Sequence, residues 1–97
     1  MVIYEVNLTV PKDFYPDFQS WLNNHIKKML LFNGFIKHKQ YLIHSNNKND
    51  MSLSIHYYVK SMKHLNDYFS KSAKQMREEG IKKFGNNLVV TRRILEI

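Results

Sequence analysis

The chain has 97 residues, a net charge of +7 and no cysteine. This length predicts one small domain spanning residues 1–97, and a hydrophobic share of 43% is too high for a disordered chain. The missing cysteines exclude disulfides, thiolate metal ligands and a cysteine nucleophile. No apolar stretch is long enough to span a bilayer, and the N-terminal residues lack signal-peptide features. We therefore expect a cytoplasmic protein without a membrane partner.

The positive charge comes mainly from lysine. Twelve of the fifteen basic residues are Lys and three are Arg, whereas planar recognition of phosphate or guanine favours Arg. The basic residues are also scattered along the chain. This pattern favours a lysine-biased surface over a nucleic-acid partner, which stays the least favoured functional alternative.

Period-two alternation predicts the first strand, from Val2 to Val10, and Pro11 ends it. A helix follows, with Asp13 as its predicted N-cap and Pro16 in its first turn. Gly34 is suited to the end of that helix. The apolar stripe of the helix consists of Phe14, Phe18, Trp21, Leu22, Ile26, Met29 and Leu30.

The next two strands, Phe35 to His44 and Met51 to Val59, form a predicted hairpin with an Asn-rich turn. The first of them alternates poorly, which favours an edge position. The last predicted strand runs from Leu88 to Ile97 and is rich in β-branched residues.

A second helix lies between the hairpin and the last strand, with Ser61 as its predicted N-cap. Gly80 leaves two readings of this helix open. The spacings Glu78–Lys82 and Glu79–Lys83 favour a helix that continues past Gly80, whereas the glycine itself favours a break there.

The order β-α-β-β-α-β predicts an α+β fold of the ferredoxin-like kind, with a four-stranded antiparallel sheet covered on one face by two helices. Right-handed crossovers place the first strand between the third and the last. The first strand then turns Val2, Tyr4, Val6 and Leu8 toward the helices.

The other face of the sheet mixes polar and apolar residues. It carries Ile3, Glu5, Asn7 and Thr9 from the first strand, Ser52, Ser54, His56 and Tyr58 from the third, and one of two mostly apolar sets from the last strand, beginning at Leu88 or at Val89. A face left to solvent is polar throughout. The mixture therefore predicts a homodimer packed sheet to sheet around a two-fold axis.

Several short motifs resemble a bacterial family of small proteins known only as a domain of unknown function. They are Tyr4-Glu5-Val6, Trp21-Leu22 with His25, Met29-Leu30, Gly34-Phe35, His56-Tyr57, Ser61, Leu65, Tyr68, Met76 to Gly80, Phe84-Gly85 and Arg92 to Glu96. That family is similar to the dimeric α+β barrel superfamily, which includes cofactor-independent monooxygenases, small-ligand binders and haem-degrading enzymes. The resemblance implies this fold and dimerisation, and it implies no particular activity.

Two histidines are candidates for chemistry. His25 lies on the stripe of the first helix and is either a base or haem ligand, or a core-edge histidine with paired nitrogens. His56 neighbours Glu5 across the sheet, with Arg92 or Arg93 on the other side of Glu5. This group either abstracts a proton and holds an anionic intermediate, or forms an ion-pair network at a dimer interface. The second reading of each histidine is favoured.

Arg77 either reaches an anionic ligand or ties the second helix to the turn that follows it. No metal is expected, because the sequence has no His-x-His motif, no carboxylate triad and no thiolate. No nucleotide cofactor is expected, because three glycines cannot form a phosphate loop. His38 and His44 lie about 20 Å apart on one strand, although one hairpin register places His38 opposite His56. The candidate ligand-binding residues are Glu5, Asn7, His25, His56, Tyr58, Arg77 and Arg93.

The leading hypothesis is a homodimeric module that binds a small apolar or aromatic ligand. The alternative is a cofactor-independent monooxygenase or isomerase, with His56 or His25 as base and Tyr57, Tyr58 or Arg93 orienting the substrate.

Overall fold

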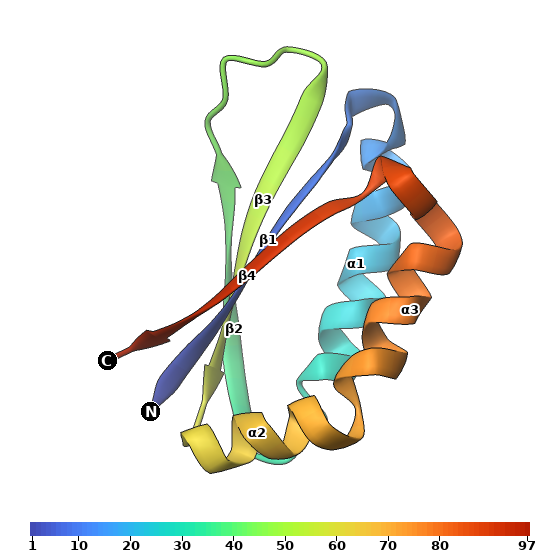
Figure 1. Ribbon diagram of the computed structural model, residues 1–97. Coiled ribbons are helices and arrows are strands. Elements are labelled where there is room, and N and C mark those ends of the chain that lie inside the picture. The colour runs from blue at the N-terminus through green and yellow to red at the C-terminus, as the bar shows by residue number, and fades with distance from the viewer.

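The computed structural model describes residues 1–97 as a four-stranded sheet with its helices packed on one side (Figure 1). Its helices and strands are β1 (Val2–Pro11), α1 (Tyr15–Met29), β2 (Phe35–Ile43), β3 (Asp50–Val59), α2 (Met62–Lys71), α3 (Ala73–Phe84) and β4 (Val89–Glu96). Short 3₁₀ turns precede α1 and β4, at Lys12–Phe14 and Gly85–Asn87. This order confirms the predicted βαββαβ fold, with the second helix divided into two pieces.

The strands lie in the order β2-β3-β1-β4, and all neighbours are antiparallel. The first strand is therefore between the third and the last, as the crossover rule predicted. Glu5 lies opposite His56 on β3 and opposite Arg93 on β4. Since alternate residues of a strand share a face, β4 contributes to the open face the set that begins at Val89.

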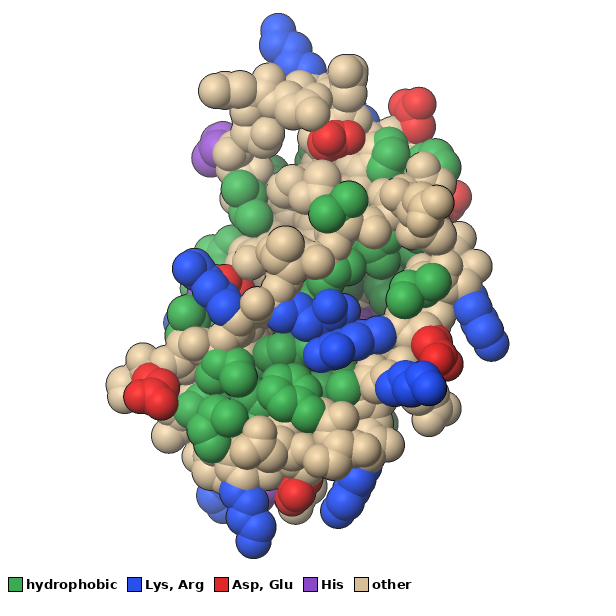
Figure 2. Space-filling model, viewed as in Figure 1, with side chains coloured by type: hydrophobic (Ala, Val, Ile, Leu, Met, Phe, Trp, Pro, Cys, Tyr) green, Lys and Arg blue, Asp and Glu red, His purple; other side chains and the backbone are tan.

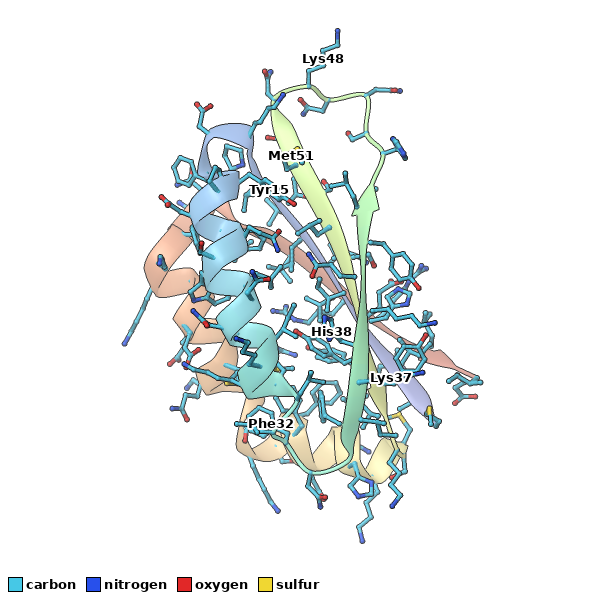
Figure 3. All side chains as sticks on the ribbon, turned by 180° about the vertical axis from the view of Figure 1, so that it is seen from behind. Tyr15, Phe32, Lys37, His38, Lys48 and Met51 are labelled. Atoms are coloured by element: carbon cyan, nitrogen blue, oxygen red, sulfur yellow. The ribbon has the colours of Figure 1, made fainter.

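The edge strand β2 pairs only with β3, and Phe35 is its only buried residue. Its poor alternation is explained by this position, because the helices pack on the central strands. A bulge between Phe35 and Lys37 shifts the register, and His38 lies opposite Tyr57. His56 faces Lys39 instead, so the register that paired the two histidines is wrong. Figure 3 shows Lys37 and His38 on this strand, with Lys48 at the tip of the β2–β3 loop.

The start of α1 differs from the sequence prediction. Residues 12–14 form a 3₁₀ turn, and Phe14 rather than Asp13 is the N-cap residue. Asp13 therefore lies one residue too early to cap α1, and no side chain caps it. Phe14 is 37% exposed, so its place in the apolar stripe was also wrong. Pro16 does lie in the first turn, where the missing N–H costs no helical bond.

The second helix is interrupted at Ser72, not at Gly80. Ser72 has φ −135° and ψ −22°, outside the helical region, and separates α2 from α3. Gly80 lies inside α3, where a Cβ atom would come within 3.1 Å of the Trp21 ring. The glycine therefore permits the close approach of α3 and α1. Ser61 caps α2 as predicted, by accepting a hydrogen bond from the His64 N–H at 3.3 Å.

The predicted i,i+4 pairs of α3 are not formed. Glu79 instead turns toward α1, where its carboxylate lies 3.4 Å from Lys28 Nζ and 3.7 Å from His25 Nδ1. These contacts link the two helices across the pocket described below. No helix in the chain is long and apolar enough to cross a membrane.

The core lies between the sheet and the helices. The inward face of β1 matches the prediction, with Val2, Tyr4, Leu8 and Val10 buried and Val6 half-buried. Ile55, Tyr57 and Val59 of β3 pack beside them, against Phe18, Leu22, Ile26, Met29, Leu65 and Met76 from the helices. Burial of these apolar side chains is the main favourable term in the stability of the fold.

Candidate functional site

The sequence-predicted residues lie on opposite sides of the sheet. Glu5, Asn7, His56, Tyr58 and Arg93 are on the open face. His25 and Arg77 are on the other side, where they line a pocket between the helices and the sheet. One site containing all seven residues is therefore excluded by the topology, and each group is considered separately.

On the open face, Glu5 is the centre of a hydrogen-bonded network. One carboxylate oxygen, Oε1, lies 2.9 Å from His56 Nε2, and the other accepts a hydrogen bond from Asn7 Nδ2 at 3.0 Å. Arg93 donates from Nε to Oε2 and from Nη2 to Oε1. Glu5 is only 4% exposed. The Arg93 hydrogen bond is the main cause that holds the pKa of Glu5 below its usual range, and Asn7 and His56 act in the same direction.

This network has little free capacity for chemistry. Both oxygens of Glu5 are engaged, and the Nε2 atom of His56 is held by one of them. The three side chains pair with one another as the ion-pair reading expects, while the Nδ1 atom of His56 makes no hydrogen bond within the chain. Tyr58 takes no part in the network and packs under Lys37, whose Nζ is 4.9 Å from the ring centroid.

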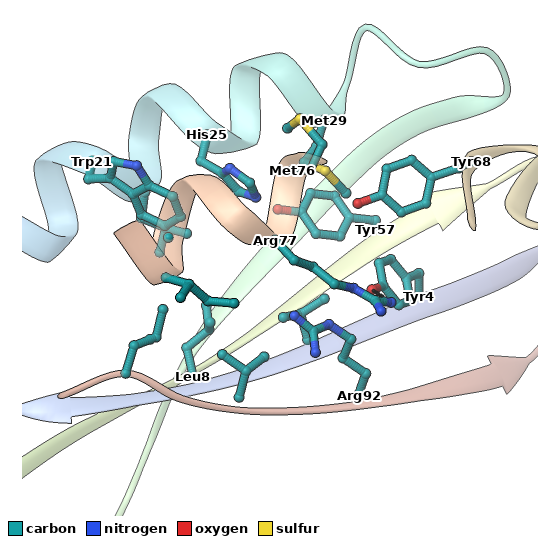
Figure 4. Close-up of a pocket in the computed structure, with 16 residues that line it drawn as sticks. Tyr4, Leu8, Trp21, His25, Met29, Tyr57, Tyr68, Met76, Arg77 and Arg92 are labelled. Carbon is teal, nitrogen blue, oxygen red and sulfur yellow. Dashed lines mark hydrogen bonds between the residues drawn. The ribbon is translucent and has the colours of Figure 1, made fainter. Parts of the chain in front are cut away.

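The pocket on the helix side has a volume of about 270 Å³. It lies between α1, α3 and the inward face of β1, β3 and β4, and Figure 4 shows the side chains around it. Its walls are mainly apolar and aromatic: Tyr4, Val6, Leu8, Trp21, Leu22, Met29, Tyr57, Tyr68, Met76, Gly80, Ile81, Leu88 and Val90. The polar side chains are His25, Arg77 and Arg92. Apolar walls with a few polar groups are typical of small-molecule sites.

His25 stacks on Trp21 inside this pocket, with ring centroids 4.6 Å apart. Its Nδ1 atom is buried without a hydrogen-bond partner, because the Glu79 carboxylate at 3.7 Å is too far to accept a bond. Burial lowers the pKa of His25, and Glu79 only partly opposes that effect. The imidazole is therefore neutral at neutral pH, and its Nδ1 atom makes no hydrogen bond within the chain.

Three tyrosines complete the polar lining. The Tyr4 hydroxyl accepts a hydrogen bond from Arg77 Nη2 at 3.3 Å. The hydroxyls of Tyr57 and Tyr68 have no partner within the chain, and both side chains are almost fully buried. Burial is the main cause that raises the pKa of each hydroxyl, so both stay protonated and can donate a hydrogen bond. Figure 4 shows Tyr57 and Tyr68 directed into the same space as His25.

Arg77 reaches the pocket, and it does not tie α3 to the following turn as one reading proposed. Arg92 also lines the pocket, from β4. Sequence reasoning considered Arg92 only as a partner of Glu5, because the inward face of the last strand was open. It missed Tyr4, Trp21 and Tyr68 as lining residues. Their helical or alternating spacing marked them only as core residues, and no local signal distinguishes a core wall from a pocket wall.

Several solved structures share this fold, and some of them are described as monooxygenases or oxygenases. A candidate antibiotic biosynthesis monooxygenase from Deinococcus radiodurans has a similar structure, with a TM-score of 0.74 and 10% identity over 100% of this chain and 92% of that protein. SnoaB, a cofactor-independent oxygenase from Streptomyces nogalater, has a TM-score of 0.68 and 10% identity over 99% of this chain and 92% of its own. An ethyl tert-butyl ether D family protein from Bacillus halodurans has a TM-score of 0.65 and 19% identity over 100% of this chain and 99% of its own. At these identities the likeness shows the fold alone.

The chain belongs to the family described as Domain of unknown function (DUF4286), whose model matches residues 1–97. No curated protein matches the sequence. A de novo designed protein, Foldit4, shares the fold with a TM-score of 0.62 at 11% identity over 99% of this chain and 97% of its own. The architecture therefore carries no activity by itself, and function has to be inferred from the pocket.

Proposed function

We propose that the protein binds a small, largely apolar or aromatic molecule in the pocket between α1, α3 and the sheet. The observation that carries this proposal is a cavity with mainly apolar and aromatic walls and a few polar side chains. The hydroxyls of Tyr57 and Tyr68 make no hydrogen bond within the chain, and both side chains point into the pocket beside His25 (Figure 4). A ligand with a flat apolar body and one or two polar atoms would supply those hydrogen bonds.

The size of the pocket supports a small ligand. Its volume of about 270 Å³ is just below the range of about 300–1,000 Å³ that is usual for ligand sites. Trp21, Tyr57 and Tyr68 offer ring faces and edges to an aromatic guest. The interior of a well-packed domain has few voids larger than a water molecule, so a cavity of this size also supports a binding role.

An NMR titration with naphthamide, a neutral aromatic compound, tests the proposal. Trp21 is the only tryptophan and lines the pocket, so its indole N–H gives one signal that reports on this site. We expect that signal to move saturably. Val90→Phe should block binding because Val90 lines the pocket, whereas Val89→Phe, on the opposite face of the same strand, should not. An unmoved signal, or equal binding by both variants, would contradict the proposal.

The open face supports a proposal of homodimerisation. It combines the buried Glu5 network with aliphatic residues near its margins, of which Val89 is 59% exposed and Ile97 is 76% exposed. A second copy packed on this face would cover them around a two-fold axis. Sedimentation of Leu95→Glu is the test, with Leu31→Glu on the far side of the molecule as control. We expect only Leu95→Glu to give a monomer, and a monomeric parent protein would contradict the proposal.

A cofactor-independent oxygenase or isomerase is the second candidate function. It is favoured by the neutral His25, whose ring lines the pocket, and by the likeness of the fold to such an oxygenase. In this role His25 would take a proton from an acidic C–H or O–H group of the ligand. His56, the other predicted base, lies on the open face and does not line the pocket.

Oxygen uptake in the presence of a dihydroxynaphthalene tests this second function. His25→Gln should reduce any protein-dependent uptake, while His56→Gln, on the opposite face, should retain it. Uptake that is equal with and without the protein, or unchanged in His25→Gln, would remove the enzyme hypothesis and leave the binding proposal intact.

A further inference from the structure

The three arginines of this lysine-rich chain all lie at one of the two candidate sites. Arg93 pairs with Glu5 on the open face. Arg77, from α3, and Arg92, from β4, both line the pocket. No lysine lines the pocket, although the chain has twelve. The planar guanidinium group binds a carboxylate through two parallel hydrogen bonds, which a lysine ammonium cannot do.

Neither pocket arginine has an acidic partner. The contacts of carboxylates with basic side chains are Glu5 with His56 and Arg93, and Glu79 with His25 and Lys28. Arg77 donates only to the Tyr4 hydroxyl, and the Arg92 guanidinium makes no hydrogen bond within the chain. This is the reverse of the open face, where Arg93 has a carboxylate directly opposite it in the sheet.

The two positive charges act on the same part of the pocket. Figure 4 shows the guanidinium groups of Arg77 and Arg92 beside each other, near Tyr4. Burial raises the pKa of Tyr68, and the charges of both arginines oppose that rise, as expected if both lie close to its hydroxyl. Like charges that share a partly enclosed site repel each other, and an anion between them would remove this cost. In Figure 2 basic side chains gather in the middle of the face next to a hydrophobic patch.

We infer that the ligand of this pocket is a small organic acid, with its carboxylate between Arg77 and Arg92 and its apolar body against Trp21 and Met29. This inference rests on the proposed binding function and adds the chemical class of the ligand. Both arginines are exposed at the rim, whereas Leu22 and Met29 are buried among the walls. The site is thus positive at its mouth and apolar inside, which matches an acid with an aromatic or aliphatic body.

Calorimetric titration with naphthoate and with naphthamide tests the inference. The two compounds have the same ring system, and only naphthoate is charged at neutral pH. We expect naphthoate to bind about tenfold to a hundredfold more tightly, the factor that charge-assisted hydrogen bonds provide. The double variant Arg77→Gln/Arg92→Gln should bind both compounds about equally. The control Lys74→Gln/Lys82→Gln removes the same charge from α3 positions outside the pocket lining and should keep the preference.

The outcomes separate the two proposals. Equal binding of both compounds by the parent protein would overturn the organic-acid inference and leave the pocket proposal standing. A preference that persists in the double arginine variant would also overturn it, because the charge would then be recognised elsewhere. If the lysine control lost the preference for naphthoate to the same extent, the preference would reflect general electrostatic attraction. That result would also overturn the organic-acid inference. Binding of neither compound would overturn the proposed function itself.

Discussion

The two faces of the sheet carry similar polar side chains in opposite states of pairing. On the open face Glu5, His56 and Arg93 satisfy one another. On the helix side His25 and Arg92 lack a hydrogen-bond partner within the chain, although both border a cavity. Paired groups stabilise a structure, whereas unpaired groups around a cavity are available to a ligand. The contrast indicates why the pocket, and not the more conspicuous charged network, is the better candidate for function.

The largest expected effect comes from a difference in packing within the helix-side face of the sheet. Val59 is fully buried in the core, so Val59→Phe should overpack it and cost about 1–3 kcal/mol of stability. Val90→Phe adds the same atoms beside the cavity and should be neutral or slightly stabilising. Urea unfolding of both variants measures the difference. Equal destabilisation would indicate that the cavity is not open in solution.

Removal of one charge should also affect the two faces differently. Glu5→Gln weakens the acceptor shared by Asn7, His56 and Arg93, and we expect a loss of about 1–2 kcal/mol of stability. Arg92→Gln leaves no partner unpaired, so stability should change by less than about 0.5 kcal/mol. Chemical denaturation at low salt compares them. If Arg92→Gln were as damaging as Glu5→Gln, Arg92 would have a structural partner after all.

The smallest expected effect is in the pH dependence of stability. Burial lowers the pKa of His25 below the reference value of 6.5, so the unfolded chain takes up this proton first as the pH falls. The contribution of neutral His25 to the free energy of unfolding is fully present above about pH 6.5. It is lost as the pH falls toward the pKa of His25 in the folded protein. His25→Gln should therefore flatten the decline in this window, and His44→Gln, at an exposed position, is the control.

A second acid-sensitive window belongs to Glu5. Its pKa is lowered mainly by the Arg93 hydrogen bond, so its contribution is present above the unfolded value of 4.5 and is lost as the pH falls through the folded pKa. Melting temperatures measured within each of the two pH windows distinguish the two residues. If His25→Gln altered only the lower window, His25 would not be the buried neutral group described here.

The sequence predicted the fold well because its signals are local and periodic. Alternation identified β1 and its inward face, and Ser61 identified the start of α2. The β2 register was not predictable, because a bulge near Phe35 has no sequence signal. The break at Ser72 was missed for a similar reason: Gly80 is the expected helix breaker, but packing against Trp21 keeps it helical.

The candidate site was only half predictable. The alignment of Glu5 with His56 and an arginine followed from strand order, and the register selected Arg93. The pocket could not be derived in the same way. A cavity depends on how fully several side chains from six elements fill a space, so Tyr4, Trp21 and Tyr68 looked like ordinary core residues. His25 was found because a histidine on an apolar stripe is unusual, and Arg77 because the Met76 to Gly80 segment was considered as a binding motif.

The most direct test of the account is a map of backbone amide shifts on addition of naphthoate. We predict saturable changes around Trp21, His25 and Arg92, with residues such as His38 on the edge strand unaffected. Changes centred on the open face around His56 and Arg93, or no saturable change, would contradict the assignment of the pocket as the functional site.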